Sequence, residues 1–146
     1  MAVEPTAAAC VLASVAAGAA VEVPGPHDSA MAGLNCGRPS PLTLPVIAER
    51  LTGFVAIDDE HAEDATRRLA AEGVEVGESA AAALGGLLAL APAERYALGL
   101  TPASAVVLLL TEGVTDPVNY RRITGSGPGS GTTIETTREE NAPWQR

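Results

Sequence analysis

The sequence predicts an α/β fold of three layers, in which helices flank a mostly parallel sheet. Val106–Leu110 is an unbroken apolar run that begins with β-branched residues, which is typical of a strand buried on both faces. Phe54–Ile57 is a second short apolar run, and a helical pattern up to Gly73 follows it directly, which gives half of a β-α-β unit. Glu78–Leu90 is apolar nearly all round, which indicates a buried helix.

Length and composition limit the classes of protein to consider. With 146 residues, the chain is long enough for one domain with its own core, built from Ala, Val and Leu because aromatic residues make up only 3%. The net charge of −9 argues against nucleic acid and anionic membrane surfaces as partners. No apolar stretch reaches the roughly 18 residues of a membrane span, and no basic residues precede the apolar N-terminal stretch. We therefore expect a cytoplasmic protein.

The elements of the N-terminal third follow from turn and cap signals. Met1–Pro5 has the pattern of a strand end. Thr6 is a candidate N-cap for a helix that stops at Gly18. A short strand is predicted within Ala19–Pro24, and a further helix is expected to begin near Pro45.

Two glycines interrupt the predicted buried helix at Gly85 and Gly86. Each costs about 1 kcal/mol in helix propensity relative to alanine. Their presence predicts either close packing against a neighbouring element or a small-residue face turned toward a ligand. Pro92 and Pro117 then favour the starts of two further helices.

Several chemically active residue types have more than one interpretation. Cys10 and Cys36 are either small buried residues or a pair that bonds under oxidation. Asp58–Glu60 fits the first turn of a helix, where the macrodipole favours acids, better than a calcium loop. Thr111 follows the Val106–Leu110 run, and ligands of open α/β sheets bind just outside the carboxyl ends of strands. Thr111 is therefore either a ligand-facing hydroxyl or part of a polar turn.

The chain changes in character after residue 124. Residues 125–131 have linker composition, and no strand precedes them as a phosphate-binding loop would require. Residues 132–146 are polar and contain Trp144. We expect residues 1–124 to form one domain and residues 125–146 to be a disordered tail.

A series of short motifs occurs in a family-like order along the chain. They are Glu4-Pro5, Ala9-Cys10, Met31-Ala32-Gly33-Leu34-Asn35-Cys36-Gly37 with Pro39-Ser40, Gly77-Glu78-Ser79, and Leu110-Thr111-Glu112-Gly113-Val114-Thr115-Asp116-Pro117. The set resembles the C-terminal part of diaminopropionate ammonia-lyase, over about residues 1–124. That family belongs to the fold-type-II pyridoxal-phosphate (PLP) enzymes, with threonine dehydratase, threonine synthase and the tryptophan synthase β subunit.

The resemblance implies the C-terminal portion of a fold-type-II PLP enzyme that catalyses β-elimination on a small amino acid. Diaminopropionate would yield pyruvate and ammonia, with PLP as the electron sink. Thr111 matches the position whose hydroxyl faces the pyridine nitrogen of the cofactor. Glu78 matches an acid near the ring. Met31, Ala32 and Gly33 match a segment at the cofactor face, so the implied cofactor-binding residues are Thr111, Glu78, Ala32 and Gly33.

The chain departs from the family pattern in two ways. Ser79-Ala80-Ala81 replaces the family's Ser-Gly-Ala, and no lysine occurs anywhere, since all nine basic residues are arginines. PLP chemistry requires an amine nucleophile, and the only amine here is the α-amino group of Met1. The family's lysine and phosphate-binding loop lie upstream of the matched region. We therefore expect a gene fragment, one half of a split enzyme or a decayed copy, inactive alone. Possible partners are an N-terminal half chain or a second copy, and the alternative function is a non-catalytic assembly module.

Overall fold

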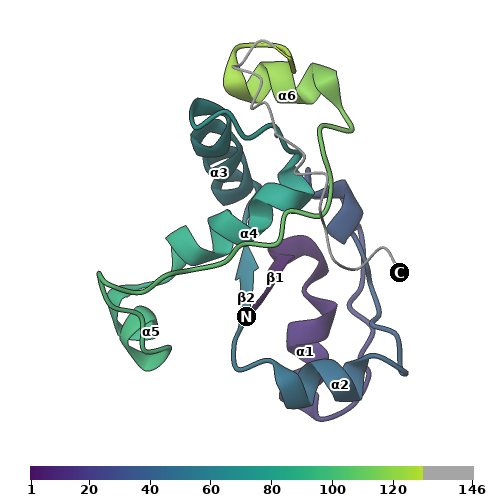
Figure 1. Cartoon of the computed structure of the whole chain (residues 1–146). Helices are drawn as coiled ribbons and strands as arrows, with labels where there is room; N and C mark the ends of the chain where they lie inside the picture. Colours follow the sequence, from purple (N-terminus) through teal and green to yellow (C-terminus); the bar gives the residue numbers. More distant parts are fainter. Residues whose placement is uncertain (130–146) are drawn as a thin grey trace, which may run out of the picture.

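The computed structural model describes residues 1–129. Two strands, β1 (Ala2–Pro5) and β2 (Phe54–Ile57), pair in parallel, with Val3 opposite Val55. Helices α3 and α4 lie beside this sheet, while α1 and α2 lie near its other end and α5 projects away from the rest (Figure 1). The predicted α/β class with parallel pairing is confirmed.

The N-terminal helices are shorter than expected. Thr6 does not cap a helix but donates its hydroxyl to Asp58 Oδ1 at 2.6 Å and begins a 3-10 turn, Thr6–Ala8. Gly18 stops α1 as predicted, because it adopts the left-handed conformation with φ of 67°. Within the described residues, the Ala19–Pro24 segment forms no strand. The remaining elements of this part are α1 (Cys10–Ala17), a 3-10 turn (Ala32–Leu34) and α2 (Leu44–Arg50).

The helices predicted in the second half of the chain are confirmed. They are α3 (Asp59–Ala71), α4 (Glu78–Ala89), α5 (Pro92–Ala97) and α6 (Pro117–Thr124). Asp116 caps α6, since its side chain accepts hydrogen bonds from the backbone N–H groups of Val118 and Asn119, both at 3.0 Å. Asp58 occupies the N-cap position of α3, so the acids of Asp58–Glu60 do lie at a helix start.

The core is formed on both sides of α4. One cluster contains Met31, Ile57, Ala62 and Ala82, and the other contains Ala65, Val76, Ala80 and Ala81. The two clusters join α4 to the sheet and to α3. Small side chains dominate because the helices approach closely.

Gly85 and Gly86 permit that approach, so the first of their two predicted roles is confirmed. A Cβ added at Gly86 would lie 2.4 Å from Val3 Cγ2 of β1. One added at Gly85 would lie 3.0 Å from the His61 carbonyl oxygen of α3 and 3.1 Å from Ile57 Cδ1. These two glycines therefore allow α4 to lie directly against β1 and α3.

The prediction that Val106–Leu110 is a strand is wrong for the described structure. The segment is an extended connection between α5 and α6 and forms no strand within residues 1–129 (Figure 1). Val107 and Leu109 are 85% and 77% exposed. The physical reason is the lack of a neighbour: β1 and β2 pair with each other, and an apolar run becomes a strand only when another strand supplies its hydrogen bonds.

Most of the predicted tail, residues 125–146, lies outside the described residues. Gly125 ends α6 in the left-handed conformation with φ of 78°. The N–H of Gly129 donates to both carboxylate oxygens of Glu75 at 2.8 Å. Along residues 1–129, none of the helices is both long and apolar enough to span a bilayer.

Candidate functional site

A cavity of about 510 Å³ lies between β1, α4 and the extended segment that ends at Thr111. Its lining at one end includes Leu34 of the Ala32–Leu34 turn, Ser79 of α4 and Thr111. Its size falls in the range of sites for small organic molecules. The cavity thus brings Thr111 together with the turn that carries Ala32 and Gly33.

Gly33 fixes the turn to the first turn of α4. Its N–H donates to Ser79 Oγ at 2.9 Å, although the two residues are 46 positions apart. A Cβ at Gly33 would lie 3.1 Å from the same oxygen, so a larger residue would push the turn away. Ala32 and Gly33 are both exposed in the described chain, which leaves their backbone accessible from solvent.

Glu112 lies at the same place, and sequence analysis did not single it out. A Cβ at Gly33 would lie 3.5 Å from Glu112 Oε2, and one at Gly77 would lie 3.1 Å from Oε1. The carboxylate therefore lies beside the N-terminus of α4, where the helix macrodipole favours negative charge. Ser79 and Glu112 both belong to motifs quoted above, but only the folded structure brings them together.

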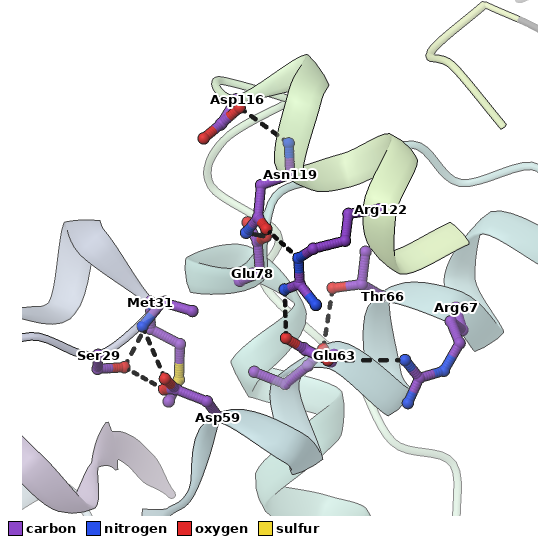
Figure 2. Close-up of polar contacts among 12 residues, drawn as sticks. Ser29, Met31, Asp59, Glu63, Thr66, Arg67, Glu78, Asp116, Asn119 and Arg122 are labelled. Carbon is purple, nitrogen blue, oxygen red and sulfur yellow. Dashed lines mark hydrogen bonds and ion pairs between the residues drawn. The ribbon is translucent and has the colours of Figure 1, made fainter. Parts of the chain in front are cut away.

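Glu78 is held by α6. It is 7% exposed, and its carboxylate accepts a hydrogen bond from Asn119 Nδ2. Asn119 Oδ1 accepts from Arg122 Nε at 2.7 Å, and Arg122 donates to Glu63 Oε1 at 2.5 Å (Figure 2). The hydrogen bond to Glu63 raises the pKa of Arg122. Glu78 thereby links the start of α4 to α6 and α3, and its bonded partner is Asn119 rather than a group of the cavity.

Asp59 holds the Ala32–Leu34 turn from its other side. Ser29 Oγ donates to Asp59 Oδ1 at 2.5 Å, and the N–H of Ala30 donates to Oδ2 at 2.9 Å. Ser29 Oγ in turn accepts from the N–H of Met31 at 3.0 Å, and Met31 is fully buried (Figure 2). The junction of β2 and α3 therefore positions the turn at the cavity.

Cys10 and Cys36 are free thiols, one buried and the other exposed. Burial, with further contributions from neighbouring Cys36 and Glu4, raises the pKa of the Cys10 thiol to about 11. Cys10 is thus a small buried residue. Pairing of the two thiols under oxidation stays a prediction.

The chain matches a family model described as pyridoxal-phosphate dependent enzyme over residues 1–112. It is 33% identical over 135 residues to diaminopropionate ammonia-lyase of Escherichia coli strain K12, which covers 86% of this chain and 34% of that protein. The chain therefore spans about a third of the length of the curated relatives it matches.

Solved structures agree with this match. Diaminopropionate ammonia lyase from Escherichia coli in complex with D-serine superposes with a TM-score of 0.72 at 30% identity, covering 84% of this chain and 32% of that one. A fungal L-serine ammonia-lyase from Rhizomucor miehei gives 0.70 at 26% identity, over 86% and 40%. A threonine deaminase, from the organism abbreviated T.th., gives 0.66 at 25% identity, over 78% and 38%.

Proposed function

Because this chain belongs to the family of pyridoxal-phosphate-dependent enzymes, we propose that it forms the C-terminal part of an ammonia-lyase acting on a small amino acid. The proposed reaction is β-elimination, with diaminopropionate as substrate and pyruvate and ammonia as products. Similarity to lyases named for diaminopropionate and for L-serine supports this substrate class. Residues 1–124 would form the enzyme part and residues 125–146 a tail beyond it.

The observation that carries the proposal is the meeting of Thr111, Ser79 and the Gly33 turn at one cavity. These residues fit one side of the cofactor. PLP supplies an electron sink when bound. The Thr111 hydroxyl would face the pyridine nitrogen, and a neutral hydroxyl does not hold that nitrogen protonated as a carboxylate would. Ala32 and Gly33 would lie at the cofactor face.

Glu78 would act on the site through structure. Its bond to Asn119 holds the first turn of α4, from which Ser79 orients the N–H of Gly33. Asp59 would hold the far end of the same turn through Ser29. Together the two acids keep the Ala32–Leu34 turn in place at the cavity.

The residues present do not supply the amine that PLP chemistry requires. All nine basic residues are arginines, whose guanidinium groups stay protonated and cannot act as the nucleophile. We propose that the lysine, and the groups that bind the phosphate, come from polypeptide outside these 146 residues. The coverage of 34% of the lyase length is consistent with this division.

The test is a titration of the purified full chain with PLP, followed by borohydride reduction and mass analysis. The chain alone should give no stable adduct. The chain joined at its N-terminus to the part of the Escherichia coli lyase outside the match should gain a visible absorption band, a reduced adduct and pyruvate formation from diaminopropionate. Replacing Ser79 by alanine in the joined protein should weaken PLP binding. A saturable, stoichiometric adduct on the chain alone would contradict the proposal.

The lack of lysine also supports a second candidate function, a non-catalytic assembly module that keeps the fold. The same experiment separates the two. A joined protein that folds but binds no PLP would favour the assembly module.

A further inference from the structure

The cavity continues from the candidate site toward an apolar end with an unusual construction. Met1 and Val3 of β1 line it, and Val106–Leu109 also contributes to its lining. One edge of β1 is occupied by β2, and no other strand of the described residues pairs with its second edge. The apolar end is thus bordered by a strand edge and an extended segment.

The extended segment has the side-chain pattern of a strand although it has no partner. Leu108 and Leu110 are half-buried, whereas Val107 and Leu109 are exposed, so burial alternates with the strand period of two. Leu110 packs on the cluster formed by α3 and α4, which anchors one face of the segment. Among the described residues, no backbone hydrogen bond involves Val106–Leu110.

We propose that one apolar β-strand, from the lysine-bearing part of the same enzyme fold, lies in this cavity and pairs with both β1 and Val106–Leu110. A strand is the element that can form hydrogen bonds along two edges at once, at a spacing of about 4.8 Å on each side. It would turn the extended segment into a strand and the two-stranded sheet into a four-stranded one. This inference rests on the proposed function.

Length and charge favour that occupant over a second copy of the chain. About two thirds of the length of the curated relatives lies outside the match, which leaves ample polypeptide to supply a strand. Each copy carries a net charge of −9, so two copies would repel one another. The inserted strand would be apolar, because Ala83 and Leu87 of α4 also line the cavity.

The inserted strand would also complete the candidate cofactor site. Ser79 and Thr111 line the same cavity as Val3 and Val107, so a strand at the apolar end closes that end from solvent. The chain that supplies the strand would then also deliver the missing amine side of the site. Strand pairing and cofactor binding are therefore separate measurable steps of one assembly.

Amide hydrogen exchange tests the pairing in the full chain and in the joined protein described above. The amides of Val106–Leu110 should exchange fast in the chain alone and at least about tenfold more slowly in the joined protein, with the α3 amides as the internal control for folding. Fast exchange at Val106–Leu110 beside a protected α3 in the joined protein would overturn the proposal. Protection in the chain alone together with a concentration-dependent dimer would also overturn it, because a second copy would then be the occupant.

A pair of variants gives an independent test. Val107→Asp changes a cavity residue that is 85% exposed, and Leu42→Asp changes a residue 86% exposed that does not line this cavity. In the chain alone neither should lower the melting temperature by more than about 4 °C. In the joined protein only Val107→Asp should remove the protection of Val106–Leu110. Equal effects of the two variants there, or a large loss for Val107→Asp in the chain alone, would overturn the proposal.

The same samples separate this inference from the proposed function. Protected Val106–Leu110 amides without a PLP adduct would keep the strand and refute the function. A PLP adduct and pyruvate formation without protection would do the reverse.

Discussion

Replacing Gly86 by alanine tests how closely α4 lies against the sheet. The new Cβ would lie 2.4 Å from Val3 Cγ2 and 2.9 Å from Val3 Cγ1, and neither methyl can move far because the side chain branches at Cβ on a strand. Overpacking of this kind costs about 1–3 kcal/mol. The gain in helix propensity offsets about 1 kcal/mol of it. We expect a net loss of up to about 2 kcal/mol in the free energy of unfolding.

A double-mutant cycle with Val3→Ala isolates the contact. Once the two methyl groups are gone, Gly86→Ala should stabilise the chain by about 1 kcal/mol through propensity alone. Urea unfolding of the full chain and its three variants then gives a coupling energy of about 1–3 kcal/mol. Gly113→Ala, where an added Cβ meets nothing within 4 Å, is the control. The reasoning fails if Gly86→Ala is equally stabilising whether residue 3 is valine or alanine.

Two further predictions concern buried polar groups. Asn119→Leu should lower the free energy of unfolding by about 1–3 kcal/mol, because the buried Glu78 carboxylate loses its donor, while Val118→Asn on the exposed face of α6 should change it little in the same urea titration; equal losses would contradict this. The free energy of unfolding should also fall as the pH rises from 9.0 toward about 11, because the Cys10 thiol ionises in the unfolded chain before it does in the folded one. Cys10→Ala should flatten that part of the pH profile, and an unchanged slope would rule out Cys10 as its source.

The helices of the second half could be predicted from the sequence because their signals are local. The spacing of apolar residues and the starts at Asp58 and Pro117 specify α3 and α6 without reference to distant residues. Thr6 shows the opposite case. Its hydroxyl could cap a helix, but in the structure Asp58 binds it from across the fold.

Val106–Leu110 shows why strands are harder to predict than helices. Its apolar pattern correctly indicates a segment made for burial, and Leu110 is indeed packed on the core. Whether such a segment is a strand depends on a partner that the segment itself does not contain. The described residues provide none, so the pattern alone led to the wrong assignment.

The candidate site divides along the same line. Thr111, Glu78, Ala32 and Gly33 were reached through motifs, and their roles toward the cofactor stay predictions. The structure adds Ser79 as the partner of the Gly33 N–H.

The sequence by itself determined the helix positions, the parallel α/β class, the family resemblance and the lack of any lysine, because composition, periodicity and motifs are local properties of the chain. Only the tertiary structure decided that Gly85 and Gly86 serve close packing, that Glu78 binds Asn119, and that the apolar run before Thr111 borders a cavity with an unpaired strand edge. Each of those outcomes depends on atoms far apart in the sequence, and their distances exist only once the chain has folded.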